Sequence, residues 1–216
     1  MVTANLNNDF RKILNEEFFL NLPDGMPAVW VGRIKGAKKM QRCYGPDFFK
    51  YVLKESANTE IKHFFCGGKE GVADELKKEC EISFNNKNVV GTFCPPFRKM
   101  TESELLELSQ KVKKTNANIV WIGLSTPKQE EFAVQLKSFL KDQIIITVGA
   151  AFDFHTGKVR QAPKWIQKIG MEWFFRLAIE PKRLYKRYSL IVPLFLYYNL
   201  VDFIKYLLLV IKEKNN

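Results

Sequence analysis

The stretch IKHFFCGGKEGVADELKKEC, residues 61–80, runs from an apolar segment through two glycines into a helical pattern. The apolar segment reads as a buried strand, and the apolar spacing after it indicates a helix. Gly67 and Gly68 stand at the turn, where free backbone N–H groups and the positive end of a helix dipole would suit a nucleotide diphosphate. The glycines can equally serve only to make a tight strand-to-helix turn, so this motif alone leaves both interpretations open.

The same alternation continues along the chain. The segments KNVVGTF, NIVWIGL and QIIITVGA read as further strands, and TESELLELSQKVKK and PKQEEFAVQLKSFL read as helices. Thr101 and Glu104 have the spacing of a capping box at the start of the first of these helices. Strands with few polar residues, separated by amphipathic helices, predict an α/β fold, a Rossmann-like parallel sheet with helices on both faces.

Ligands of such sheets bind beyond the carboxyl ends of the strands, so the loops after the predicted strands are candidate sites. One of them is GLSTPKQEE, residues 123–131. Gln129 can donate and accept hydrogen bonds, which suits a sugar hydroxyl or the edge of uracil. Glu130 lies in the first helical turn, where it can equally complement the helix dipole. Spacing alone favours the structural role for this cluster.

Two further loops contain candidate acids and bases. Asp24 precedes a glycine in NLPDGMPAVW, and a carboxylate there can act as a general base. Asp-Gly is also a common turn, and residue type alone favours the turn. The loop GAAFDFHTGK, residues 149–158, contains Asp153, expected to organise the loop, and His155, a candidate acid or base for which a surface role is favoured.

The composition excludes several classes of site. The four cysteines form no CxxC pair, and there are only two histidines, so neither a zinc site nor a disulfide scaffold is expected. There is no Asp-x-Asp pair to hold a divalent cation against a diphosphate. We therefore expect no metal and no cofactor. The first residues lack the pattern of a signal peptide, which predicts a reduced, cytoplasmic setting.

The net charge of +11 implies an anionic partner, and its distribution is local. Residues 158–188 contain nine Lys or Arg residues and two acidic ones. The composition changes near residue 157, which predicts a Rossmann-like catalytic domain over 1–157 and a basic, apolar helical appendage over 158–216. A recognised nucleic-acid-binding motif is lacking, so we expect no nucleic-acid partner, although the charge alone leaves that alternative open.

The appendage contains EWFFRLAIEPKRLYKRY, residues 172–188. Helical spacing would place aromatic and aliphatic side chains of this stretch on one face and Arg176, Arg183 and Arg187 on another. Such a helix can lie in a bilayer interface, hold a diphosphate, or present an ordinary solvated face. Residues 189–211 are mostly apolar but include Asp202 and Lys205, which are costly inside a bilayer. The pattern favours peripheral attachment to an anionic membrane over a spanning helix.

Taken in order, these stretches resemble the WecG/TagA/CpsF glycosyltransferases, glycosyltransferase family 26. The resemblance covers nearly the whole chain. It rests on six segments in the family's order: TAN (3–5), LPDGM (22–26), RCYGPDFF (42–49), FFCGGKEGVA (64–73), WIGLSTPKQEEF (121–132), and VGAAFDFHTGKVRQAPKWIQKIGMEWFFRLAIEPKRLYKRY (148–188). Each piece is unspecific alone, whereas the last long block and the order of all six are highly specific.

The resemblance implies a Rossmann-like fold of the GT-E type and an inverting, metal-independent transfer of a sugar, of the N-acetylmannosamine type or a related one. The donor would be a UDP-sugar. The acceptor would be an undecaprenyl-diphosphate-linked sugar at the cytoplasmic face of the membrane, in cell-surface polysaccharide or teichoic acid synthesis. The oligomeric state is left open.

The resemblance also implies roles for particular residues. Asp24 matches the family's proposed base, which reverses the preference for a simple turn. Thr3, Asn5, Arg42 and Gln129 match residues that line the active pocket, with Gly67, Gly68 and Glu130 beside them as substrate-binding candidates. The cations Arg176, Arg183, Lys186 and Arg187 match the appendage that meets the membrane and the acceptor diphosphate.

One feature departs from the family's pattern. Members usually have a further segment, including a strand, before the T-x-N motif, whereas Thr3 lies near the start of this sequence. A truncated chain, a wrongly assigned start codon, or a divergent form with an incomplete sheet would each produce this arrangement. The alternative function is accordingly a non-catalytic relative that binds a nucleotide-sugar or a membrane.

Overall fold

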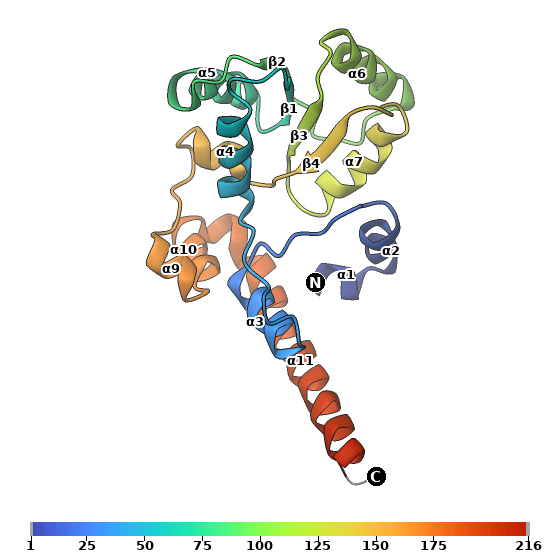
Figure 1. The fold of residues 1–216 in the computed structure, drawn as a ribbon, viewed down its shortest axis with the longest axis vertical. Helices are drawn as coiled ribbons and strands as arrows, with labels where there is room; N and C mark the ends of the chain where they lie inside the picture. Colours follow the sequence, from blue (N-terminus) through green and yellow to red (C-terminus); the bar gives the residue numbers. More distant parts are fainter. Residues whose placement is uncertain (1, 215–216) are drawn as a thin grey trace. The chain divides into compact units, whose positions relative to one another are not determined.

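The computed structural model describes the backbone of residues 2–214 and the side chains of residues 2–206 and 208 (Figure 1). The chain divides into two compact units. The first, here called the helical unit, comprises Met1–Arg11, Gly25–Arg42 and Gln161–Asn216. The second, called the sheet unit, comprises Lys12–Asp24 and Cys43–Arg160. The functional division predicted at residue 157 stays a prediction.

The sheet unit is built on four parallel strands. These are β1 (His63–Gly67), β2 (Val89–Phe93), β3 (Ile119–Gly123) and β4 (Ile144–Thr147), in the order β2-β1-β3-β4. β1 and β3 are buried throughout because they are central strands, which explains their uninterrupted apolar sequences. The predicted α/β fold with a Rossmann-like parallel sheet is confirmed.

Helices cover both faces of this sheet. On one face lie α4 (Gly45–Glu55), α5 (Val72–Phe84) and the short α8 (Ala151–His155), packed around Phe49, Phe65, Trp121 and Phe152. On the other face lie α6 (Glu102–Lys114) and α7 (Lys128–Lys137), whose apolar side chains pack on Phe64 and Ile122. Alternate residues of β1 therefore enter opposite cores, as a two-residue strand period requires.

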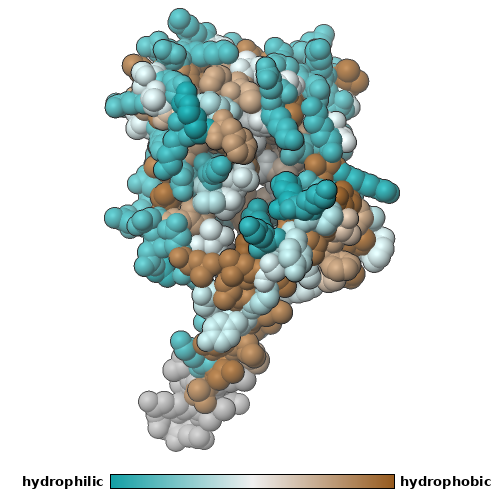
Figure 2. Space-filling model, turned by 180° about the vertical axis from the view of Figure 1, so that it is seen from behind, coloured by the Kyte–Doolittle hydropathy of each residue, from teal (hydrophilic) through white to brown (hydrophobic). Residues whose placement is uncertain are grey.

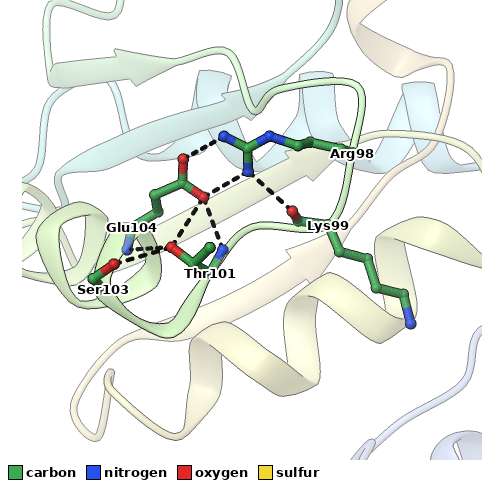
Figure 3. A network of polar contacts seen from close by, with 5 residues as sticks. All are labelled: Arg98, Lys99, Thr101, Ser103 and Glu104. Atoms are coloured by element: carbon green, nitrogen blue, oxygen red, sulfur yellow. Dashed lines mark hydrogen bonds and ion pairs between the residues drawn. The ribbon is translucent and has the colours of Figure 1, made fainter.

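The predicted capping box of α6 is confirmed (Figure 3). The Glu104 backbone N–H donates to Thr101 Oγ1 at 3.3 Å, and the Thr101 N–H donates to the Glu104 carboxylate at 2.8 Å. The Arg98 guanidinium adds two hydrogen bonds to the same carboxylate, at 2.7 and 2.8 Å. These contacts hold the pKa of Glu104 down to about 2.

The helical unit contains α1 (Val2–Leu6), α3 (Met26–Ile34), α9 (Lys164–Lys168), α10 (Glu172–Ile179) and α11 (Pro181–Lys214), while α2 (Asn8–Glu16) crosses the division between the units. Within the helical unit, α1 and α10 both contact α11. None of the helices within residues 2–214 combines the length and the apolar content that crossing a bilayer requires.

The interpretation of residues 172–188 as one helical surface is wrong. The backbone leaves the helix at Glu180, with φ −123° and ψ 55°, and α11 starts afresh at Pro181. The cause is local, because a proline disfavours helical geometry at the residue before it. Trp173 and Tyr188 still meet across the break, with ring centroids 6.1 Å apart.

Candidate active site at the carboxyl edge of the sheet

The strand order places a topological switch point between β1 and β3, because the chain leaves β1 towards β2 and then crosses to β3. Ligands of open α/β sheets bind at the carboxyl edge beside such a point. At this edge the strands end in Gly67 and Gly123, and a Cβ on Gly67 would lie 2.5 Å from the Gly123 carbonyl oxygen. Only glycine permits this close approach.

The two glycines after β1 have a structural explanation. Gly68 N–H donates to Gly123 O at 2.9 Å, and Gly67 and Gly68 have φ of 139° and 75°, values that disfavour other residues. The first turn of α5 also contains Asp74 and Glu75, which complement the helix dipole. Binding of a phosphate at this turn therefore stays a prediction, and the geometry supports the tight-turn role.

Asp24 lies beside the start of α4. The Gly45 N–H donates to Asp24 Oδ1 at 3.0 Å, and the Cys43 N–H donates to Pro23 O at 2.9 Å. Gly45 is the first residue of α4, so the positive end of that helix favours an ionised carboxylate here. Burial, with the nearby Asp24 charge, raises the pKa of the Cys43 thiol. Asp24 is thus an exposed carboxylate held at a helix N-terminus.

Gln129 and Glu130 lie in the first turn of α7, and both are buried, with exposures of 6% and 7%. Gln129 Oε1 accepts from the Gly149 N–H at 3.0 Å, and its Nε2 donates to Glu130 Oε1 at 2.9 Å. Thr126 Oγ1 donates to the same Glu130 oxygen at 2.9 Å. Glu130 Oε2 is buried and accepts no hydrogen bond from the described residues.

The Asp24 and Gln129 contacts meet at the turn after β4. Gly45, whose N–H donates to Asp24, packs against this turn, since a Cβ added to Gly45 would lie 3.4 Å from the Val148 carbonyl oxygen. Gly149, the residue after Val148, donates its N–H to Gln129. The structure therefore brings Asp24, Gln129 and Glu130 to one stretch of the carboxyl edge. This convergence is the geometry expected of a site for a polar ligand.

The other predicted site residues belong to the helical unit. Thr3 and Asn5 lie on α1. The Arg42 guanidinium donates to Gln167 Oε1 at 3.1 Å and to Glu172 Oε2 at 2.5 Å, and its ion pair with Glu172 is largely buried. This network joins Arg42 to the start of α10.

The four cations predicted for the appendage lie on α10 and α11. Arg176 on α10 and Arg183 on α11 flank Glu180, with nearest nitrogen–oxygen distances of 3.9 and 2.5 Å. Lys186 and Arg187 lie exposed on α11. Their predicted roles towards a membrane or a diphosphate stay predictions.

Sequence reasoning missed three residues that organise these sites: Gly45, Thr126 and Glu172. Gly45 precedes Pro46, a residue favoured in the first helical turn, so its place at a helix N-terminus has a local signal, whereas its contact with Asp24, 21 residues away, has none. The pairing of Glu172 with Arg42 spans 130 residues and has no local signal. In the described part of the chain, no three His, Cys, Asp or Glu side chains gather as metal ligands would.

The fold is that of a Rossmann-like α/β protein, and the cluster of Asp24, Gln129 and Glu130 lies at the carboxyl edge of its sheet, beside the turns after β3 and β4. The chain belongs to the WecG/TagA/CpsF family of glycosyl transferases, whose family model matches residues 1–207. It is also 26% identical over 210 residues to the N-acetylglucosaminyldiphosphoundecaprenol N-acetyl-beta-D-mannosaminyltransferase of Bacillus subtilis (strain 168), an alignment covering 97% of this chain and 75% of that protein. The chain is therefore a glycosyltransferase, of the hexosyltransferase class.

Proposed function

We propose that this glycosyltransferase moves an N-acetylmannosamine-type sugar from a UDP-sugar to an undecaprenyl-diphosphate-linked sugar, with inversion and without a metal. The name of the Bacillus subtilis relative supports the acceptor class and the sugar. The observation that carries the proposal is the convergence of Asp24 and Gln129 on the turn after β4, at the carboxyl edge of the sheet.

In this mechanism Asp24 is the general base. The acceptor hydroxyl oxygen bonds to the anomeric carbon as the bond from that carbon to the phosphate oxygen breaks, and the hydroxyl proton passes to the Asp24 carboxylate. The electron pair leaves with UDP, whose new charge a guanidinium such as Arg42 would stabilise. An ionised Asp24 is a prerequisite, and the N-terminus of α4 favours it.

Gln129 and Glu130 serve to orient the donor. The Nε2 hydrogens of Gln129 are directed at Glu130 Oε1 and Thr126 Oγ1, so its remaining capacity is one acceptor lone pair on Oε1, which a ligand hydroxyl can use. Glu130 Oε2 is a buried acceptor that a sugar or ribose hydroxyl would satisfy. A ligand hydroxyl bound there would relieve the cost of a buried, unsatisfied carboxylate oxygen.

The reaction takes place, in this proposal, at the cytoplasmic membrane face, where the helical unit meets anionic lipid. The helical unit contains 16 Lys or Arg residues and 5 acidic ones, whereas the sheet unit contains 18 of each. The whole net charge of +11 thus belongs to the helical unit, which also contains the exposed aromatic and aliphatic side chains of α10 and α11. Cations beside exposed apolar groups are typical of an interfacial surface.

The decisive experiment is the Asp24→Asn substitution, assayed as UDP release and lipid-product formation over a panel of UDP-sugars. We expect kcat to fall by at least about 100-fold, because a positioned general base contributes about that much or more. Asp142→Asn, an exposed aspartate of the sheet unit, is the matched control and should retain the wild-type rate. An Asp24→Asn protein with undiminished kcat would remove Asp24 from the mechanism.

A further inference from the structure

The turn after α3 forms a second basic and apolar surface, separate in sequence from the C-terminal appendage. Residues 26–42, MPAVWVGRIKGAKKMQR, contain five Lys or Arg residues and no acidic one. Trp30 and Ile34 on α3 are 41% and 57% exposed, and Lys38 and Lys39 are exposed on the turn that follows. Apolar and cationic side chains thus gather within ten residues.

This turn is held in one conformation by hydrogen bonds. Arg33 Nε donates to the Met40 carbonyl oxygen at 2.9 Å, the Ala37 N–H donates to Gly32 O at 2.9 Å, and Gly36 takes φ 104°. The Met40 side chain also lies against Gly32 of α3. Because the turn is tied back onto α3, the backbone at Lys38 and Lys39 is held near the end of this helix.

An ion pair joins the end of α3 to the middle of α11. Lys35 Nζ donates to Asp202 Oδ2 at 2.6 Å, and Lys35 holds the pKa of Asp202 below its usual value. Asp202 stands among exposed apolar residues of α11, including Leu200 and Ile204. The pair compensates the Asp202 charge and joins α3 to α11, beside which α3 lies in Figure 1. Figure 2 shows hydrophobic residues gathered on this part of the helical unit.

We propose that α3 and its turn, residues 30–39, form a second lipid-contacting element that binds an anionic bilayer together with α11. Trp30 and Ile34 enter the interface, and Lys38 and Lys39 bind lipid phosphates. Anionic lipid is the occupant that fits, because a second copy would bring one basic surface against another and repel it. This inference rests on the membrane association in the proposed function and adds a specific element to it.

The test is cosedimentation with vesicles of phosphatidylcholine and phosphatidylglycerol in a ratio of roughly 7:3. We expect the double substitution Lys38→Glu/Lys39→Glu to weaken binding at least tenfold, since each lysine near an anionic surface contributes strongly. The matched control is Lys113→Glu/Lys114→Glu, an adjacent and likewise exposed pair in the sheet unit, which should bind within about twofold of wild type.

A second pair of variants tests the apolar contribution. Ile34→Ser should weaken vesicle binding at least threefold, because an inserted isoleucine side chain leaves water. Ile82→Ser is the control, since Ile82 is 80% exposed on α5 of the sheet unit. Both Ile34 and Lys38/Lys39 variants should keep wild-type transfer to a short-chain, water-soluble lipid-diphosphate acceptor.

The outcomes separate this inference from the proposed function. If wild type binds vesicles and the Lys38/Lys39 and Ile34 variants bind equally well, the α3 surface is overturned while the transferase mechanism stands. If these variants instead convert a wild-type dimer into a monomer in sedimentation velocity, the surface is a contact between copies and the inference is wrong. Loss of activity in Asp24→Asn bears on the mechanism alone.

Discussion

At the scale of single residues, His63 at the start of β1 is a fully buried titratable group. Trp121 Nε1–H donates to His63 Nδ1 at 3.1 Å, so the remaining ring hydrogen is on Nε2, 2.8 Å from Ser56 Oγ. Burial lowers the pKa of His63 to about 4. The folded protein therefore keeps this ring neutral through mildly acidic conditions.

The sign of the resulting pH dependence follows from linkage. The folded pKa lies below the usual 6.5, so the unfolded chain binds the proton first and stability is lost as pH falls from about 6.5 to 4. Between pH 7 and pH 5 this loss amounts to about 2 kcal/mol for His63. His155, whose pKa burial also lowers, adds a loss of the same sign.

We expect His63→Gln to reduce the pH dependence of the free energy of unfolding between pH 7 and pH 5. Glutamine retains hydrogen-bonding groups but does not titrate, so about 2 kcal/mol of the wild-type difference should disappear. Urea unfolding of both proteins at pH 7 and pH 5 measures this difference in stability directly. His155 is present in both proteins, so its contribution cancels in the comparison. Equal pH dependence in the two proteins would show that His63 does not remain neutral on folding.

At the scale of elements, the capping box of α6 illustrates stabilisation by purely local contacts (Figure 3). Thr101 satisfies one of the N–H groups that the first turn leaves without an intrahelical partner. Thr101→Ala should lower the free energy of unfolding by about 1 kcal/mol, and Thr101→Ser should largely restore it. Chemical denaturation measures both, and transferase activity should be unchanged. An alanine variant as stable as wild type would show that the Arg98–Glu104 contacts suffice alone.

The elements that the sequence could predict are those whose signals are local. The four strands follow from apolar segments and α6 from its cap, because burial and capping act on neighbouring residues. The division of 172–188 at Glu180 was missed because helical spacing was given more weight than Pro181. The basic surface of α3 has a local signal in the five cations of residues 26–42, whereas its contact with Asp202, 167 residues away, has none.

In the candidate site, too, the sequence predicts only the residues that have a local signal. Gln129 and Glu130 lie at a strand end, where the rule for parallel sheets places ligands, and the structure puts them there. Asp24 has no such signal, because its donor Gly45 lies 21 residues further on, and only family resemblance singled it out. The family resemblance also singles out Arg42. Its contacts with Gln167 and Glu172 have no local signal, because they span 125 and 130 residues.

At the scale of the whole molecule, charge is divided between the two units. The sheet unit has equal numbers of acidic and basic residues, while the helical unit holds the entire excess. Under the proposed function, the neutral sheet unit, which contains Asp24 and Gln129, binds and releases an anionic nucleotide without a large nonspecific attraction, because long-range electrostatic potential follows net charge. The excess positive charge is concentrated instead in the unit that contains most of the exposed large apolar side chains of the described residues.

This segregation predicts how vesicle binding depends on salt. Affinity for vesicles containing phosphatidylglycerol should fall at least tenfold between about 50 and 300 mM NaCl, because the Debye length shortens from roughly 14 to 6 Å over that range. Vesicles of phosphatidylcholine alone should bind weakly and with little salt dependence, since only apolar contacts remain. Cosedimentation across the salt series measures both. Strong, salt-independent binding to phosphatidylcholine would mean that apolar burial alone holds the protein on the membrane and that the charge of the helical unit has another partner.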